Sequence, residues 1–362
     1  MKEIPFFTNE LKKLFSPPKL DSLILYVTSR CNARCDFCCY HENLNAVPEL
    51  SLTEIIKISE HIPVLKGLLI GGGEPFLRED MAEIISLFVS NCHVEVLQIP
   101  TNGYFTDRIV SLAQNLTSRF PKLNLAIQIS LDAIGEKHDA IRGLKNCFQQ
   151  AEKTIAAIKA IRNKDMHLRI LVVSVLTPET IKTCRDLVTY VKEKIDPDYH
   201  WFEPVRDMPH IQKHLLLSQD DIAFLRDNLK YYLQKAKGTT SSIYNSHTFN
   251  KLITSFSLNN FDIAYNNLLH NKRWPVYCCA GKRMAVIYPD GTLTACELRG
   301  EALNIKNFSY NITEALKQAQ FKNVREDIAH HVCDCTHGCF IPISVRYSPA
   351  ELIKIFWKSY SL

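Results

Sequence analysis

Three cysteines lie close together near the start of the chain, at Cys31, Cys35 and Cys38. They follow an apolar, strand-like run from Leu23 to Val27. Iron–sulfur clusters are normally bound by cysteine thiolates, so this loop predicts ligands for three irons of a cubane [4Fe–4S] cluster. The fourth iron would be open to a ligand from outside the protein, which suits chemistry better than electron carriage alone.

Two alternatives remain open for this loop. Structural zinc takes four ligands, and Cys39 would supply the fourth. The cysteines could also be unrelated buried residues.

A run of three glycines, Gly71 to Gly73, precedes Glu74 and Pro75 about 35 residues downstream of the cysteine loop. The chain has only 12 glycines. Three in succession indicate a backbone that curves freely or approaches a ligand closely. A plain glycine turn is the alternative if the run is considered alone.

Together, the cysteine loop and the Gly-Gly-Gly-Glu-Pro run resemble the motifs of the radical SAM superfamily, from about Asp21 to Cys339. The resemblance implies that the open iron chelates the amino and carboxylate groups of S-adenosylmethionine (SAM). It also implies that an electron from the cluster cleaves the sulfonium to a 5′-deoxyadenosyl radical. The expected fold is a partial (β/α)6 TIM-like barrel.

The resemblance also implies which residues handle SAM. Glu74 and the backbone beside it would bind the methionine amino group, and Phe37 would lie beside the adenine. Arg142 has an alternative role in an ion pair with Asp139 at a helix start. The implied SAM-binding residues are Phe37, Gly72, Gly73, Glu74, Pro75, Asn102, Ser130, Arg142 and, as a weaker candidate, Ser174.

A second group of cysteines lies near the C-terminus. The turn sequence Pro289-Asp290-Gly291 predicts a β-hairpin with Cys279 and Cys296 at its outer ends. The segment resembles the SPASM/Twitch extension of radical SAM enzymes, including its Gly-x4-Cys element from Gly291 to Cys296. The six cysteines of the group are Cys278, Cys279, Cys296, Cys333, Cys335 and Cys339.

A full SPASM extension has seven ligating cysteines for two clusters, whereas this chain has six, two of them adjacent. The count favours one auxiliary [4Fe–4S] cluster bound by Cys279, Cys296, Cys335 and Cys339. Cys278 or Cys333 could replace one of these ligands, and an all-cysteine structural zinc site is the alternative for the group. Three histidines are near enough to complicate the ligand set, namely His330, His331 and His337.

Short apolar runs alternate with helical patterns from Ser22 onward, which predicts an α/β fold with a parallel sheet. A doubly wound open sheet would give the same alternation. The predicted strands are Ser22–Thr28, Gly67–Ile70, Val94–Ile99, Leu123–Ser130, Leu168–Leu176 and Tyr199–Val205. The predicted helices between them are Ser51–Ile62, Asp80–Ser90, Asp107–Arg119, Cys147–Arg162 and Pro178–Lys194.

The alternation stops after the sixth strand, which divides the chain into five predicted parts. A short N-terminal extension precedes the barrel, and a helical linker or cap precedes the cysteine-rich module. The predicted boundaries are 1–20 for the extension, 21–207 for the barrel, 208–274 for the linker, 275–345 for the SPASM/Twitch-like module and 346–362 for the tail.

The composition is that of an ordinary globular enzyme, with 46% hydrophobic and 22% charged residues. A net charge of +5, with few runs of basic residues, does not predict nucleic-acid binding. No apolar run approaches the ~20 residues of a membrane helix, and no secretory signal is present, so we expect a cytoplasmic protein. The 13 cysteines then indicate metal or redox chemistry, with Cys92, Cys147 and Cys184 as core residues.

We therefore expect a radical SAM enzyme that oxidatively modifies a small polar metabolite, such as a sugar or aminocyclitol. An external one-electron reductant of the flavodoxin or ferredoxin type is implied. Asp132 and Glu203 are candidate bases because each follows or ends a strand. Only about 20 residues precede the first strand, too few for the leader-peptide domain of many peptide-modifying relatives.

Two alternatives are kept. One is a peptide or protein maturase, which cross-links a ribosomal peptide or resembles a sulfatase maturase. The other is a non-catalytic iron–sulfur or zinc scaffold, which would not need the glycine run or the polar residues at the strand ends.

Overall fold

In a computed structural model of the chain, the described residues are 19–62, 64–163, 166–206, 216–235, 247–270, 272–330 and 335–361. Cys333, His331 and most of the predicted N-terminal extension lie outside them. The predicted cap between barrel and module is described only in part.

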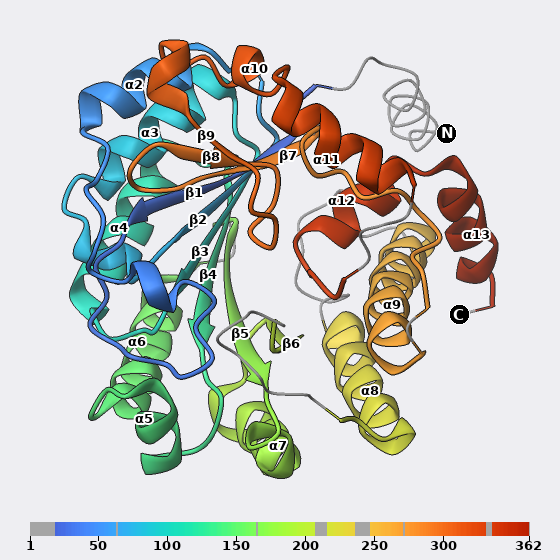
Figure 1. Cartoon of the computed structure of the whole chain (residues 1–362). Coiled ribbons are helices and arrows are strands. Elements are labelled where there is room, and N and C mark those ends of the chain that lie inside the picture. Colours follow the sequence, from blue (N-terminus) through green and yellow to red (C-terminus); the bar gives the residue numbers. More distant parts are fainter. Residues whose placement is uncertain are drawn as a thin grey trace.

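The described strands form one sheet in the order β6-β5-β4-β3-β2-β1-β7-β8-β9 (Figure 1). Strands β1 to β6 are parallel to one another, β7 is parallel to β1, and β8 and β9 are antiparallel additions. The strands are β1 (Ser22–Thr28), β2 (Gly67–Gly72), β3 (Val96–Thr101), β4 (Asn124–Ser130), β5 (Leu168–Leu176), β6 (Tyr199–Pro204), β7 (Met284–Ile287), β8 (Thr292–Thr294) and β9 (Ala302–Asn304). This parallel-dominated sheet confirms the predicted α/β class.

Helices lie on both sides of the sheet. Helices α2, α3, α4 and α6 lie along one side of the strands in Figure 1, and α8, α9, α12 and α13 lie on the other. The helices are α2 (Leu52–Glu60), α3 (Met81–Cys92), α4 (Thr106–Arg119), α5 (Glu136–Arg142), α6 (Cys147–Ile161), α7 (Cys184–Tyr190), α8 (Gln219–Lys235), α9 (His247–His270), α10 (Ile312–Ala315), α11 (Ala319–Ala329), α12 (Phe340–Arg346) and α13 (Pro349–Ser359).

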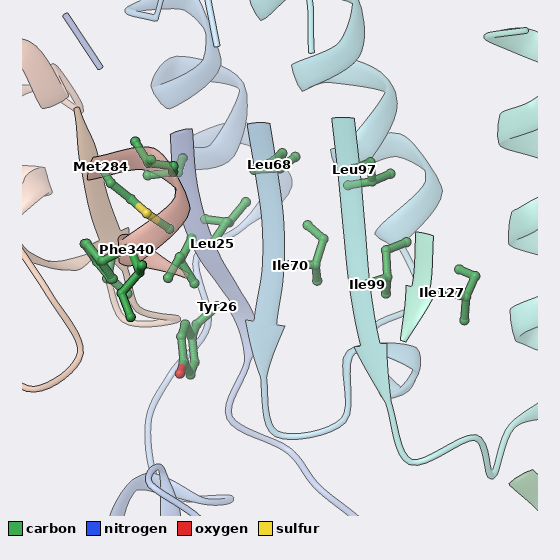
Figure 2. Close-up of a cluster of buried hydrophobic side chains, with 14 of the residues drawn as sticks. Leu25, Tyr26, Leu68, Ile70, Leu97, Ile99, Ile127, Met284 and Phe340 are labelled. Atoms are coloured by element: carbon green, nitrogen blue, oxygen red, sulfur yellow. The ribbon is translucent and has the colours of Figure 1, made fainter. Parts of the chain in front are cut away.

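Side chains alternate between the two faces of the strands, as expected for β-structure. Figure 2 shows Leu25, Ile70, Ile99 and Ile127 on neighbouring strands, all packed in the hydrophobic core. The next residues along β1 and β2, Tyr26 and Gly71, line a cavity on the opposite face. The strands thus separate a dry core under the outer helices from a cavity lined in part by polar groups.

The predicted C-terminal hairpin is present and extends the main sheet. Met284 of β7 pairs in parallel with Ser22 of β1, and β7 then turns back into β8. Figure 2 also shows Met284 and Phe340 beside Leu25, so the C-terminal segment shares the core of the main sheet. The assignment of this segment as a SPASM/Twitch-like module remains a prediction.

The part of the predicted linker that the structure describes contains two helices, α8 and α9. Helix α9 runs for 24 residues and faces β6, α12 and α13. Strand β6 is at one end of the sheet order, so the sheet forms an incomplete barrel whose open side is covered by helices. None of the helices in the described part of the chain is both long and apolar enough to cross a membrane.

Candidate functional site

The inner face of the strands and the helices opposite them enclose a cavity of about 1940 Å³. It brings together residues from the N-terminal cysteine loop, strands β1 to β6 and the C-terminal helices. Of the predicted site residues, those that line it are Cys31, Cys35, Phe37, Cys38, Gly72, Gly73, Glu74, Asn102, Ser130, Arg142, Glu203 and Cys339.

The cysteine loop is held against the end of α5. The guanidinium of Arg142 lies 5.4 Å from the centre of the Phe37 ring, and its Nη1 donates to the sulfur of Cys35 at 3.7 Å. The backbone N–H of Arg34 donates to the carbonyl of Arg142 at 2.8 Å. A positive charge beside a cysteine favours the thiolate that a cluster needs.

Two asparagines hold the start of the loop. The N–H of Cys31 donates to Asn45 Oδ1 at 3.0 Å. Asn102, at the end of β3, donates from Nδ2 to Asn32 Oδ1 at 2.8 Å. Asn102 therefore orients the loop as well as lining the cavity, a role that its weak turn signal did not predict.

The glycine run permits a close approach of two backbones. A Cβ on Gly73 would lie 2.2 Å from the carbonyl oxygen of Arg30 and 2.9 Å from Cβ of Cys31. Gly72 has φ of +131°, which strongly favours glycine, and a Cβ there would lie 2.4 Å from the carbonyl oxygen of Thr28. Any side chain at these positions would displace the chain that leads into the cysteine loop.

We expect Gly73→Ala to weaken SAM binding by about tenfold or more, because the added methyl collides with backbone rather than with a movable side chain. Calorimetric titration of SAM into anaerobically reconstituted protein measures the effect. Gly300→Ala is the matched control, since a Cβ there has no neighbour within 4 Å among the described residues. Equal SAM affinity in both variants would contradict the role given to Gly73.

Glu74 is almost fully buried and joins β2 to β3. Its carboxylate accepts hydrogen bonds from the N–H of Phe76 at 3.2 Å, from Thr101 Oγ1 at 2.8 Å and from the N–H of Asn102 at 2.8 Å. Burial raises the pKa of Glu74 to about 7, although these donors and Arg142 oppose the shift. Glu74 thus fixes the turn after β3 from within the cavity wall.

Asp132 is buried and engaged on both carboxylate oxygens. It accepts from Arg142 Nε at 2.6 Å and from the N–H of Val175 at 2.8 Å. Burial raises the pKa of Asp132, and Arg142 opposes the shift. Asp132 does not line the cavity. Through its contact with Arg142 it positions that side chain instead.

The alternative pairing of Arg142 with Asp139 is not what the structure shows. Asp139 instead accepts from the N–H groups of Asn146 at 2.6 Å and Phe148 at 2.9 Å. It therefore caps the start of α6 and leaves Arg142 to Asp132. The sequence spacing along one short helix could not separate these two arrangements.

Ser174 faces away from the cavity. Its neighbours Val173 and Val175 line the cavity, so alternation along β5 turns Ser174 to the other face. Its hydroxyl donates to the carbonyl of Leu131 and lies 2.8 Å from Nε2 of His200. This placement does not support the predicted contact of Ser174 with SAM. Pro75 is buried at the start of a short 3₁₀-helix and is also outside the lining.

Glu203 lies on the cavity wall at the end of β6. Its Oε1 accepts from Trp201 Nε1 at 2.6 Å. Burial raises the pKa of Glu203 to about 7, against the lowering effect of Arg206. A Cβ on Gly338 would lie 2.3 Å from Glu203 Oε1, so the glycine next to Cys339 allows close contact with this carboxylate.

A buried ionic network links the barrel to the C-terminal segment. Glu297 accepts from Arg206 Nη1 at 3.0 Å, is hydrogen-bonded to His337 Nε2 at 2.6 Å and accepts from the hydroxyl of Tyr26. Arg206 also donates to the sulfur of Cys39 at 3.4 Å. Although burial acts in the opposite direction, Arg206 and the donors around it hold the pKa of Glu297 well below its usual range.

Glu297 and Arg206 were not among the site residues predicted from the sequence. The available signal was the position of Glu297 directly after Cys296 and of His337 between two cysteines. In this network Arg206 donates a hydrogen bond to the sulfur of Cys39. Cys39 therefore has a different partner from Cys31, Cys35 and Cys38.

The C-terminal cysteines gather between the hairpin and α12. Burial raises the pKa of Cys296, and the charges of Cys335 and Cys278 add to the shift. Cys279 donates from its sulfur to the carbonyl of Phe340 at 3.7 Å. Among the described residues, which omit Cys333, no three His, Cys, Asp or Glu side chains are arranged to hold one metal ion. The ligand set of an auxiliary cluster thus stays a prediction.

The N-terminal donor set, three thiols in one loop, has the chemistry of an iron–sulfur site, although these side chains too are not arranged around one metal ion in the described part of the chain. Burial raises the pKa of Cys31 to about 11 and that of Cys38 to about 12, so the thiolates form when bound metal supplies positive charge. Cys31, Cys35 and Cys38 would hold the cluster. Gly72, Gly73 and Phe37, on the same cavity wall, leave room for a ligand of the open iron.

Comparison with known proteins gives the same result. Residues 25–188 match the model of the radical SAM superfamily. The chain is 24% identical over 301 residues to GTP 3′,8-cyclase of Synechocystis sp., covering 80% of this chain and 83% of that protein. It is 31% identical over 160 residues to GTP 3′,8-cyclase of Lactiplantibacillus plantarum, which is 42% of this chain and 46% of that protein.

Two solved structures share the fold. Native anSMEcpe with bound AdoMet has a TM-score of 0.56 and 19% identity, with 83% of this chain and 82% of that chain covered. SuiB of Streptococcus suis bound to S-adenosylmethionine has a TM-score of 0.55 and 15% identity, with 88% and 70% covered. At such identities these structures support the fold alone.

The cysteine loop, the glycine run and the parallel strands thus agree with the family match. Residues 25–188, a little under half of the chain, form a radical SAM domain, and domains of this family use a [4Fe–4S] cluster and SAM.

Proposed function

We propose that the chain catalyses an oxidative modification of a small polar metabolite that carries no polyphosphate group. A [4Fe–4S] cluster held by Cys31, Cys35 and Cys38, together with SAM, would supply the radical chemistry that removes a hydrogen atom from the substrate. The observation that carries the proposal is one shared cavity, with Cys31, Cys35 and Cys38 on one wall and Glu203 and Cys339 on another.

The chain's own residues have separate tasks in this proposal. Cys31, Cys35 and Cys38 hold the cluster, and Arg142 keeps their loop in place. Glu203 is the group on the cavity wall that would accept a proton when the substrate is oxidised, because burial brings its pKa to about 7. An auxiliary cluster held by Cys279, Cys296, Cys335 and Cys339 would supply the acceptor for the electron lost with that proton.

The charges of the cavity lining favour a substrate without a strong negative charge. Four basic and four acidic side chains line it, and each basic one has a carboxylate partner. Arg142 pairs with Asp132 at 2.6 Å and Arg206 with Glu297 at 3.0 Å. Arg346 and Lys66 pair with Asp21 at 3.4 and 3.6 Å. Binding a triphosphate here would require breaking buried ion pairs, which is costly.

We therefore do not propose GTP as the substrate of this chain, although two relatives are named GTP 3′,8-cyclase. The first of them is covered over 83% of its length but is only 24% identical, and the alignment with the second covers less than half of that protein. The paired arginines of this cavity do not supply the excess positive charge that a polyphosphate needs.

A peptide is the second candidate substrate, and cavity size favours it. The cavity of about 1940 Å³ exceeds the ~300–1,000 Å³ of ordinary small-molecule sites, although it must also hold the cluster and SAM. Ile353 and Trp357 of α13 line it and are 59% and 69% exposed. Apolar side chains at an opening would suit a peptide segment better than a sugar.

Release of 5′-deoxyadenosine tests the enzyme function directly. Anaerobically reconstituted protein is reduced with dithionite and mixed with SAM, and methionine and 5′-deoxyadenosine are quantified by chromatography. We expect equal amounts of the two products. Protein with a full iron content that releases neither product would be a scaffold rather than an enzyme.

A further inference from the structure

We propose that residues 1–18 cover an apolar face of α13 at one opening of the cavity. These residues precede the described part of the chain, which begins at Lys19. The surface that they would cover consists of Ile353, Trp357 and Tyr360, called the α13 stripe below. The inference goes beyond the proposed function, because it concerns a contact within the chain and depends on no substrate.

The α13 stripe is an exposed apolar surface. Of the nine large apolar side chains that are exposed in the described part of the chain, three belong to this stripe. They are spaced by four and three residues, which places them on one face of a helix. The other face packs on α9, which lies beside α13 in Figure 1, and there Ser255 Oγ donates to the carbonyl of Ile355. Apolar patches of this kind usually mark a place where something else binds.

The cavity reaches the surface at the amino ends of the strands. Its lining includes Ser22, Lys66 and Val96, together with Ile353 and Trp357 of the stripe. Ser22 and Val96 are the first residues of β1 and β3, and Lys66 directly precedes β2. Val96 is 39% exposed, so this end of the cavity is at the surface of the molecule. The cysteine loop lies after the other end of β1.

The start of the described chain is bound to the segment that leads into α13. Asp21 accepts hydrogen bonds from the hydroxyl of Tyr347 at 2.9 Å and from Arg346 at 3.4 Å, and it pairs with Lys66 at 3.6 Å. Tyr347 lies two residues before Pro349, the first residue of α13. Residues 1–18 therefore join the rest of the chain beside this opening.

The segment is long enough to reach the whole stripe. An extended chain spans up to ~3.5 Å per residue, so a segment of 18 residues reaches up to about 60 Å. Trp357 lies ten residues beyond Tyr347. At a helical rise of ~1.5 Å per residue, that separation is only about 15 Å.

The composition of residues 1–18 suits an apolar partner. Their large apolar side chains include Phe6, Phe7, Leu11, Leu14 and Phe15. Packing these side chains on the α13 stripe removes apolar surface from water on both sides, which stabilises the contact. A segment of the same chain also has a high effective concentration, so it outcompetes a second copy or a dissolved peptide of similar affinity.

A covered stripe closes the cavity at the amino ends of the strands. Closure keeps water away from reactive intermediates inside. The exposed side chains of α13 then have a partner within the chain, and they give no separate support to a peptide substrate.

Photo-cross-linking in the full chain tests the proposal. The photoreactive residue p-benzoylphenylalanine replaces Ile353, and the irradiated protein is digested and analysed by mass spectrometry. We expect cross-links to peptides from residues 1–18. Phe7→Asp should lower their yield by about tenfold or more, because the contact would then bury a carboxylate. Asn9→Asp adds the same charge at a polar position and should leave the yield within about twofold.

Ile134 is the matched control position for the probe. It is another exposed isoleucine, but it follows the carboxyl end of β4, at the other end of the strands. A probe there should not reach residues 1–18. The proposal would be overturned if the probe at position 353 formed no cross-link to these residues, or formed cross-links only to a second copy of the chain. Equal yields from both positions, or a yield unchanged by Phe7→Asp, would also overturn it.

Discussion

Replacing Cys31, Cys35 and Cys38 together with alanine removes one four-iron cluster and abolishes SAM cleavage. The three thiols lie in one loop on the cavity wall, and they are the cluster ligands of the proposed site. Iron should fall from about eight to about four per chain, taking two four-iron clusters. Iron analysis and 5′-deoxyadenosine release on the anaerobically reconstituted variant measure both effects.

Cys92→Ala is the control for this variant. Cys92 is fully buried, and its sulfur donates to the carbonyl of Ser59 at 3.2 Å, outside the cavity. Its loss should leave iron content and SAM cleavage unchanged. If the triple variant kept its full iron content, or still released 5′-deoxyadenosine, the assignment of the loop would be wrong.

Cys296→Ala should have the complementary effect. If Cys279, Cys296, Cys335 and Cys339 hold an auxiliary cluster, the variant loses about four irons but still cleaves SAM. SAM cleavage needs only the N-terminal loop, whereas oxidation of the substrate needs an electron acceptor near Glu203. Oxidised product should therefore disappear while 5′-deoxyadenosine is still released.

Retained SAM cleavage also shows that the variant is folded, which matters because metal binding and folding are coupled in small cysteine-rich segments. Metal analysis of the wild-type protein decides between the two kinds of site. Zinc in place of the second set of irons would make the C-terminal site structural and remove the electron-acceptor role.

The parallel strands could be predicted from the sequence because each is a short, mostly apolar run between helical patterns. Strand β1 and strand β5 have the predicted bounds, Ser22–Thr28 and Leu168–Leu176. Near-continuous apolar runs of this length are typical of parallel sheets. Strand β2 continues two residues further than predicted, to Gly72, because Thr28 of β1 pairs with that glycine.

Helix α9 could not be predicted, because tertiary contacts satisfy its polar side chains. Ser255 Oγ donates to the carbonyl of Ile355 at 2.9 Å, and Asn259 Nδ2 donates to Glu351 Oε2 at 2.9 Å. Both partners lie about 90 to 100 residues away on α13. In the sequence alone, these serines and asparagines resemble those of a loop.

The cysteine loop and the glycine run were visible as local motifs, but the partners of the charged residues were not. The pairing of Asp132 with Arg142 depends on how α5 folds back onto the strand end. Glu297 and Arg206 meet only because β7 pairs with β1 and brings the C-terminal segment to the cavity. Such contacts between distant segments carry no local sequence signal.

The central claim is that one iron of the N-terminal cluster has no cysteine ligand. Electron paramagnetic resonance tests this claim most directly. SAM is added to the reduced Cys296→Ala variant, so that only the cluster of Cys31, Cys35 and Cys38 contributes to the spectrum. We predict that the cluster signal shifts when SAM is added, because SAM becomes a ligand of the iron that no cysteine binds. A cluster signal that is identical with and without SAM, in protein with about four irons per chain, would contradict the account.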